Sequence, residues 1–257
     1  MCLILLAWQA HPEYPLILAA NRDEFYDRPT AAADFWSDRP DILGGRDLQD
    51  GGTWLGVTRQ GRWAALTNFR DPAAIRSGTP SRGWLVRDFL AGSERPAEYM
   101  ERLAPRARDY NPFNLFAGDQ DSLFYLSSRG PSGPVSPGVH GLSNALLDTP
   151  WPKIRRGREA FRLLLEQNPE PDPEALFRPL TDMERVPDGD LPETGIGLDW
   201  ERILSPLFIA SPTYGTRSST ILMMNRRGGI TFIERSFQGS PEPRMTARFT
   251  FSAEASP

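Results

Sequence analysis

The sequence predicts an α+β protein in which helices cover two stacked antiparallel β-sheets. Apolar strand-like segments occur in blocks toward both ends of the chain, whereas helical segments lie in blocks between them. The strict alternation of strand and helix that is typical of a parallel sheet is missing, and hairpin-like strand pairs indicate antiparallel pairing. The 25 prolines cluster in loops and not at a linker. We therefore expect a single domain over residues 1–257, with a proline-rich surface excursion near residues 168–197.

The first part of the chain contains a predicted hairpin followed by two loops. Residues 2–10 and 15–21 are apolar runs separated by a polar turn that contains a proline, which is the pattern of a hairpin. Residues 21–29 (NRDEFYDRP) are polar and are predicted to be irregular. Residues 44–52 (GGRDLQDGG) are predicted to form a glycine-rich loop.

The middle of the chain contains more strands and then helices. Strands over residues 53–59 and 62–68 meet at a tight glycine turn, and two short helices follow over residues 81–91 and 96–103. The first helix has a serine N-cap, and the second has proline in its first turn. The remaining expected elements are a long amphipathic helix over 151–167, a short helix near 173–178, and strands over 114–118, 122–127, 139–144, 207–210, 219–225, 230–237 and 244–251.

Composition and charge exclude several classes of protein. The chain carries 29 basic and 33 acidic residues, a net charge of −4, and Lys153 is its only lysine. A mildly acidic chain without a basic cluster is a poor match for nucleic acid or an anionic membrane surface. No segment approaches the roughly 20 apolar residues of a membrane-spanning helix. The apolar start, residues 1–8, lacks the positive leader of a signal peptide, so we expect a buried strand and a cytoplasmic protein.

The metal-binding and disulfide-forming residues are few. Cys2 is the only cysteine, which excludes an internal disulfide and a thiolate-rich zinc or iron–sulfur site. His11 and His140 are the only histidines and cannot build a three-histidine metal site. We therefore expect no metal.

Cys2 itself is the first candidate for chemistry. Removal of the initiator methionine would place a thiol and a free α-amine on one residue. The pKa of an α-amine is about 7.7–8.0, so a useful fraction is neutral and can accept the thiol proton. The alternative is that Cys2 is a small buried apolar residue, which is how a free cysteine usually behaves.

The polar tetrad that follows the second predicted strand is the next candidate. A hairpin would bring Asn21, Arg22 and Asp23 beside the start of the chain. Asp23 could then orient the α-amine, and Arg22 could lower the thiol pKa or bind a substrate carboxylate. The alternative is a charged turn in solvent.

Two asparagines and one arginine complete the candidate site. Asn68 and Asn144 each end an apolar strand, where their side-chain amides could stabilise a tetrahedral oxyanion. Asparagines that initiate turns are the alternative. Arg217 precedes the apolar strand that begins near residue 219 and is either a fixed positive charge at the site or an arginine at a sheet edge.

Six ordered motifs resemble those of the NRDE family, also called the transport and Golgi organisation protein 2 family. They are Met-Cys at the start, LAANRDEFYDRP, GGRDLQDGGTWLG, ALTNFRDP, GLSNALLDTPWPK and YGTRSSTIL, spread from residue 1 to roughly 240. The chain is more remotely similar to the N-terminal-nucleophile (Ntn) hydrolases of the choloylglycine hydrolase and penicillin V acylase type. That similarity implies a four-layer αββα sandwich and cleavage of an amide between an acyl group and an amine.

The resemblance also implies roles for particular residues. Cys2 matches the nucleophile, Asp23 the aspartate that contacts its amine, Asn68 and Asn144 the asparagines that serve the oxyanion or the amine, and Arg217 a late arginine of the hydrolase site. Those hydrolases place an arginine directly before their Asn-x-Asp, where this chain has Ala20. The role of Arg22 is therefore open, and we assign Asn21 and Arg22 to substrate binding.

Two functions follow from this resemblance. The first is an Ntn cysteine amidohydrolase that cleaves a small acyl amide and needs no cofactor. The second is a non-catalytic protein that binds and carries haem, acyl-CoA or a lipid in the same cleft. Cys2, His11 or His140 would then supply an axial ligand to haem.

Overall fold

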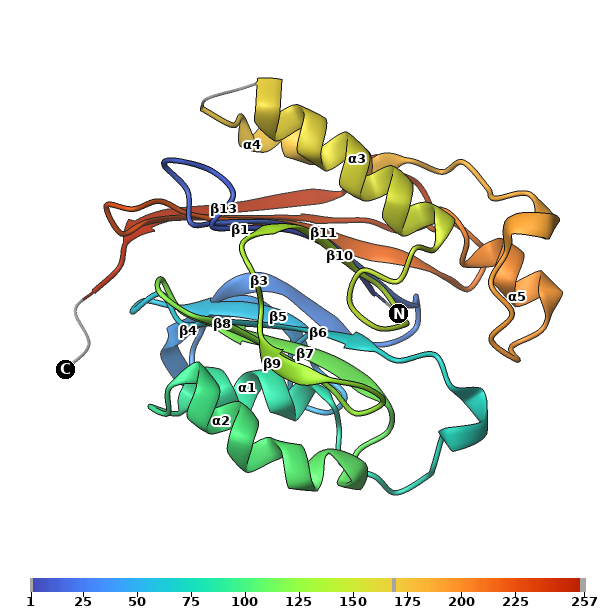
Figure 1. Ribbon diagram of the computed structural model, residues 1–257, viewed down its shortest axis with the longest axis horizontal. Coiled ribbons are helices and arrows are strands. Elements are labelled where there is room, and N and C mark those ends of the chain that lie inside the picture. Colours follow the sequence, from blue (N-terminus) through green and yellow to red (C-terminus); the bar gives the residue numbers. More distant parts are fainter. Residues whose placement is uncertain (1, 168–169, 255–257) are drawn as a thin grey trace.

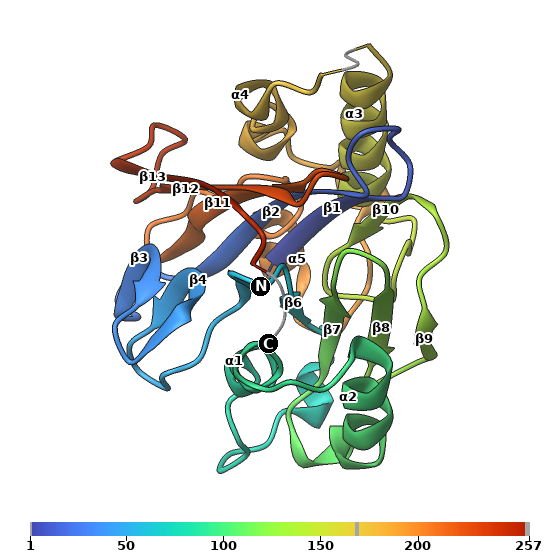
Figure 2. The same cartoon turned by 90° about the vertical axis from the view of Figure 1, so that its left-hand side faces the viewer.

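The computed structural model describes residues 2–167 and 170–254, which form two stacked β-sheets with helices on both outer faces (Figure 1). Helices α3 (Pro152–Gln167) and α4 (Pro173–Leu176) cover one sheet, whereas α1 (Gly83–Ala91) and α2 (Pro96–Leu103) cover the other. The view turned by 90° shows the same four layers (Figure 2). The predicted α+β class and the αββα arrangement are thus confirmed.

Both sheets are antiparallel. The six-stranded sheet has the order β10-β1-β2-β11-β12-β13, with β1 Cys2–Trp8, β2 Leu16–Phe25, β10 Gly138–Leu142, β11 Tyr214–Met224, β12 Gly229–Ser236 and β13 Met245–Ser252. The seven-stranded sheet follows chain order from β3 to β9, with β3 Thr30–Trp36, β4 Arg39–Asp47, β5 Leu55–Thr58, β6 Trp63–Asn68, β7 Phe113–Gly118, β8 Leu123–Ser127 and β9 Ser132–Pro134. The predicted hairpin of β1 and β2 is therefore part of the first sheet.

The alternation of side chains along β1 and β2 divides the core into layers. Leu6 and Leu18 face the other sheet and pack with Phe116 between the two sheets. Leu5 and Ile17 face the opposite side and pack under α3 and α4. Both faces of these strands are buried, which explains why their apolar runs are continuous.

The prediction that residues 21–29 are irregular was wrong for their first half. Strand β2 continues to Phe25, and its polar end is paired on both sides. Arg22 lies opposite Cys2 of β1, and Asp23 lies opposite Thr216 of β11. The polar side chains are tolerated here because neighbouring strands and loops supply hydrogen-bond partners, which the sequence pattern alone does not show.

The predicted glycine-rich loop over residues 44–52 was also partly wrong. Gly44 and Gly45 lie within β4, and only the residues after Asp47 form a turn. A Cβ atom on Gly45 would lie 2.3 Å from the indole of Trp54, so this glycine permits the close approach of the ring. The group that approaches the backbone of Gly45 is thus the side chain of Trp54.

Several smaller elements differ from the expectation. Residues 207–210 form no strand, and only Ala210 makes an isolated bridge, to Gly215. The polar residues 214–218 instead begin β11, because β2 pairs with them. Strands β3, β4 and β9 were not predicted. Ser81 is not the N-cap of α1, because the helix begins at Gly83 and its N-cap is Arg82.

The proline-rich segment after α3 contains short helices and is partly buried. Besides α4 it contains the 3₁₀ turns η3 (Pro179–Thr181) and η4 (Asp188–Asp190), and it leads to α5 (Leu198–Ile203). Leu176, Phe177 and Leu180 pack against the six-stranded sheet. The other 3₁₀ turns are η1 (Pro72–Ala74) and η2 (Ala104–Asp109). Over residues 2–167 and 170–254, no helix has the length and apolar character needed to cross a membrane.

Candidate functional site

Cys2 begins β1 at the edge of the space between the two sheets. Because side chains alternate along the strand and Ile4 and Leu6 face the other sheet, the Cys2 thiol points the same way. The thiol is free and partly exposed. Burial raises the pKa of the Cys2 thiol, the charge of Asp23 adds to this effect, and the charge of Arg22 opposes it.

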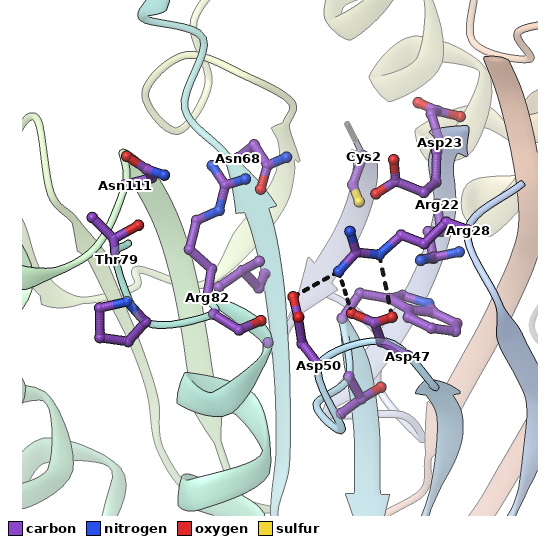
Figure 3. A pocket seen from close by; sticks show the side chains of 17 residues that line it. Cys2, Arg22, Asp23, Arg28, Asp47, Asp50, Asn68, Thr79, Arg82 and Asn111 are labelled. Carbon is purple, nitrogen blue, oxygen red and sulfur yellow. Dashed lines mark hydrogen bonds and ion pairs between the residues drawn. The ribbon is translucent and has the colours of Figure 1, made fainter. Parts of the chain in front are cut away.

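A cavity of about 220 Å³ opens in front of this thiol. One wall contains Cys2, Arg22 and Arg28, and the opposite wall contains Asn68 and Arg82 (Figure 3). Charged and polar side chains from both sheets and from the start of α1 line most of it. The cavity therefore suits a small polar ligand better than a large apolar one.

Asp23 lies one residue beyond the pairing partner of Cys2. Its carboxylate accepts a hydrogen bond of 2.7 Å from the Thr216 hydroxyl, and its backbone carbonyl accepts one from the Tyr214 hydroxyl. Burial raises the pKa of Asp23, while the positive charges of Lys153 and Arg22 oppose this. The hydrogen bond from Thr216 thus holds the Asp23 carboxylate in place, one residue beyond the partner of Cys2.

Arg22 and Arg28 are held by different partners on the same wall. The Arg22 guanidinium lies over the Trp54 ring, 4.2 Å from its centroid, and donates to the Thr30 hydroxyl. Arg28 pairs with Asp47 at 2.5 Å and with Asp50 at 2.7 Å. Arg28 is therefore neutralised by two carboxylates, while Arg22 has no carboxylate in contact among residues 2–167 and 170–254.

The two predicted oxyanion asparagines have different positions. The Asn68 side chain lines the cavity, and no hydrogen bond to it occurs within the part of the chain that the structure describes. Asn144 is 1% exposed and does not line the cavity. Its amide donates to the Asn68 carbonyl, and Ser143 beside it donates to the Cys2 carbonyl. Asn144 thus holds the backbone at Asn68, and Ser143 holds the backbone at Cys2.

Asn21 and Arg217, both predicted for the site, lie outside the cavity. Asn21 points to the helix-covered face, where its amide donates to the carbonyls of Leu180 and Leu207. Arg217 donates to the carbonyls of Phe25 and Arg28 and lines a separate hollow. The position of Asn21 follows from the alternation of side chains along β2, because neighbouring residues such as Asn21 and Arg22 face opposite sides of the sheet.

Several lining residues were not predicted. Arg28, Asp47 and Asp50 lie inside motifs that the sequence singles out, but their pairing across the loop has no local signal. Arg82 reaches the cavity from the start of α1. Behind Asp23, the buried Lys153 donates to the Leu204 carbonyl, and burial lowers the pKa of Lys153 to about 8.

The two histidines that were predicted as possible haem ligands are engaged in hydrogen bonds and do not line the cavity. His11 lies in the turn at the far end of β1 from Cys2, and its Nδ1 atom accepts from the Glu13 and Tyr14 amides. Both ring nitrogens of His140 are engaged, with Asp148 at 2.7 Å and the Ser136 carbonyl at 2.9 Å. Among the described residues, no group of three or more His, Cys, Asp and Glu side chains is placed to hold a metal ion.

Solved structures with a similar fold include two variants of conjugated bile acid hydrolase from Clostridium perfringens. The C2A mutant matches with a TM-score of 0.55 and 10% identity over 97% of this chain and 92% of that chain. A second variant matches with a TM-score of 0.53 and 11% identity, over 96% of this chain and 92% of that chain. At such identities the likeness shows the fold alone. The fold is that of the Ntn hydrolases.

The chain belongs to the Transport and Golgi organisation 2 family, whose model matches residues 1–239. The Transport and Golgi organization protein 2 homolog of Bos taurus is 38% identical over 95% of this chain and 96% of its own length. The homolog of Homo sapiens is 37% identical over 92% and 93%. Transport and Golgi organization protein 2 of Drosophila melanogaster is 27% identical over 93% of each chain.

Proposed function

We propose that this protein is an Ntn cysteine hydrolase that cleaves a small acyl amide. One observation carries the proposal: the thiol of Cys2 and the unengaged side-chain amide of Asn68 line the same small cavity. A nucleophile and an oxyanion donor that face one space are the minimum that acyl transfer requires. The Clostridium perfringens hydrolase was crystallised as a C2A mutant, so the unmutated form of that hydrolase has a cysteine as its own residue 2.

The first half of the reaction forms a thioester. Removal of Met1 leaves the α-amine of Cys2 free, and this amine accepts the thiol proton. The thiolate attacks the amide carbonyl, and the resulting oxyanion accepts a hydrogen bond from the Asn68 amide. The α-ammonium then returns its proton to the nitrogen of the leaving amine as the C–N bond breaks. Asp23 orients and stabilises the ammonium during this step.

The second half releases the acid. Water attacks the thioester carbonyl while the α-amine accepts a proton from it, and the same oxyanion position is used again. Collapse of the tetrahedral intermediate releases the carboxylic acid, and the thiolate of Cys2 recovers its proton. Arg22, which lies beside the thiol over Trp54, stabilises the thiolate form between steps.

The test uses acyl amides of 7-amino-4-methylcoumarin with acyl groups of increasing length. We expect release of the fluorescent amine by the natural chain and none by Cys2→Ala, with an intact mass that lacks Met1 in the active protein. Cys2→Ser is the matched control, because it keeps the α-amine and replaces the thiol with a hydroxyl nucleophile. Full activity in protein that retains Met1 would contradict the mechanism.

The second function, carriage of haem, acyl-CoA or a lipid, has less support from the site. The cavity is small and polar, and both histidines are engaged in hydrogen bonds. Haem titration followed by its Soret band separates the two functions. A band that appears in the natural chain and is lost in Cys2→Ala would favour the binding function.

A further inference from the structure

Three arginines line the cavity, and they differ in what holds the guanidinium group. Arg28 is paired with Asp47 and Asp50. Arg22 is held by the Trp54 ring, over which its guanidinium lies, and by the Thr30 hydroxyl, to which it donates. Arg82 makes one hydrogen bond, from Nη1 to the Pro112 carbonyl at 3.1 Å, and no ion pair among residues 2–167 and 170–254.

The neighbouring acidic residue, Glu24, forms no ion pair with Arg82 within the part of the chain that the structure describes, although its charge opposes the effect of burial on the pKa of Arg82. Glu24 lines the same cavity, but its Oε1 atom accepts a hydrogen bond from the Phe25 amide. Removal of a guanidinium from water costs free energy unless an opposite charge compensates it. Burial lowers the pKa of Arg82, and an arginine still keeps its charge at neutral pH. The positive charge of Arg82 is therefore available to a ligand.

The position of Arg82 defines where such a ligand would bind. Arg82 is the N-cap residue of α1, and Gly83 after it packs closely against the backbone of Thr53. Asn68, Thr79 and Asn111 lie on the same side of the cavity, while Cys2 lies across from them (Figure 3). Hydrogen-bond donors and a cation thus share one wall opposite the thiol.

We propose that Arg82 binds an anionic group of the substrate, a carboxylate, sulfonate or phosphate, while Cys2 attacks a carbonyl a few atoms away. This inference rests on the proposed function and adds the charge of the substrate to it. Guanidinium pairs with such groups in charge-assisted, often bidentate hydrogen bonds. The small cavity limits the distance between the anion and the reacting carbonyl.

The test uses two thiol reagents of similar shape and opposite charge. Sulfonatoethyl methanethiosulfonate is anionic, and trimethylammonioethyl methanethiosulfonate is cationic. Both form a mixed disulfide with a thiol and release methanesulfinate. Cys2 is the only cysteine, so the rate of mass gain reports this residue alone. We expect Arg82→Gln to lower the ratio of anionic to cationic rates about tenfold or more, since a hydrogen bond to a charged group is lost.

Two further variants serve as controls. Arg82→Lys keeps the charge and is expected to keep most of the ratio. Arg87→Gln removes a charge from the exposed side of the same helix, where Arg87 pairs with Asp88, and is expected to leave the ratio unchanged. Circular dichroism and the melting temperature show that each variant is folded. An unchanged ratio in folded Arg82→Gln would overturn the inference.

A pair of substrates separates this inference from the proposed function. Succinyl-aminomethylcoumarin carries a carboxylate, and its methyl ester does not. We expect faster cleavage of the succinyl amide and loss of this preference in Arg82→Gln. Equal cleavage of both amides would refute the anion site and leave the hydrolase function standing. No cleavage of either amide together with a changed reagent ratio would refute the hydrolase function and support the anion site.

Discussion

The side-chain amide of Asn144 donates a hydrogen bond of 2.7 Å to the backbone carbonyl of Asn68. The Asn144 carbonyl in turn accepts from the Arg70 amide at 2.7 Å, so the ends of two segments are locked together. Asn144 is buried behind the cavity, while Asn68 faces it. Two asparagines that the sequence treats alike therefore have different positions: Asn144 holds the backbone, and the Asn68 side chain lines the cavity.

Substitution of the two asparagines should separate activity from stability. Asn68→Ala is expected to reduce kcat by about 10²–10³, the usual effect of losing one oxyanion donor, with little change in the free energy of unfolding. Asn144→Ala is expected to reduce the free energy of unfolding by about 1–3 kcal/mol, because it leaves a buried carbonyl without its donor. Amide hydrolysis and urea unfolding measure the two effects. Normal turnover in Asn68→Ala would remove Asn68 from the mechanism.

The layered fold could be predicted from the sequence, because the apolar runs of β1 and β2 and the amphipathic helix α3 are local patterns. The continuation of β2 through Asn21, Arg22 and Asp23 could not. Its polar residues are those that usually end a strand, and they stay extended only because β11, nearly 200 residues later, pairs with them. Non-local pairing of this kind leaves no periodic signal.

The site was predictable to the extent that it depends on strand ends. Cys2 and Asn68 are terminal residues of strands that the sequence shows, and Asp23 follows the predicted second strand of the hairpin, so their proximity is expected from a hairpin and a second sheet. Arg82 could not be predicted, since nothing local distinguishes it from the many other arginines of the chain. Its role depends on which arginines have acidic partners, and these pairs form across loops.

The reactivity of Cys2 should depend on two neighbouring charges in opposite directions. Burial raises the pKa of the thiol, and the negative charge of Asp23 raises it further, so alkylation should increase with pH through a midpoint above that of an exposed thiol. Asp23→Asn is expected to lower this midpoint. Arg22→Gln is expected to raise it, because a positive charge that favours the thiolate is lost. Alkylation rates with iodoacetamide from pH 6 to 10 measure the shifts.

Identical profiles for the natural chain and both variants would show that these charges do not act on the thiol. Glu94→Gln provides the matched control, since this exposed carboxylate pairs with Arg102 on the outer face of the seven-stranded sheet. Its removal is expected to leave the profile of Cys2 unchanged.

Glu234 should make the folded state less stable above neutral pH. It is 2% exposed and accepts hydrogen bonds from the Ala33 amide and the Thr220 hydroxyl, and burial raises the pKa of Glu234 from 4.5 to about 7. The protonated form is thus favoured in the folded state. Its contribution to stability is fully present below pH 4.5 and is lost as the pH rises through 7, by up to about 3 kcal/mol.

Glu234→Gln tests this dependence, because glutamine keeps a hydrogen-bond acceptor for the Ala33 amide and cannot ionise. The variant is expected to be more stable than the natural chain at pH 8 and to be nearly equal at pH 4.5. Urea unfolding at both pH values measures the difference. A parallel pH dependence of the natural chain and the variant would assign the loss of stability to other groups.

Selective acetylation of the α-amine of Cys2 tests directly whether this amine is the proton acceptor. Lys153 is the only lysine, and its side chain is buried, with 4% of the residue exposed. An acetylating reagent at pH 7 should therefore modify the α-amine and leave Lys153 intact, as peptide mapping would show. Acetylation removes the basic lone pair of that amine. We expect turnover to be lost, while Cys2 still reacts with methanethiosulfonate reagents after hydroxylamine has removed any thioester.

The same treatment distinguishes the mechanism from a thiol that works without the amine. If acetylated protein kept its turnover, the α-amine could not be the proton acceptor, and a side chain in the cavity would have to replace it. Asp23 would be the candidate, because burial raises the pKa of its carboxyl, although the carboxylate already accepts from the Thr216 hydroxyl and the positive charges of Lys153 and Arg22 oppose that rise. Loss of turnover with retained thiol reactivity would therefore assign proton transfer to the nitrogen of Cys2.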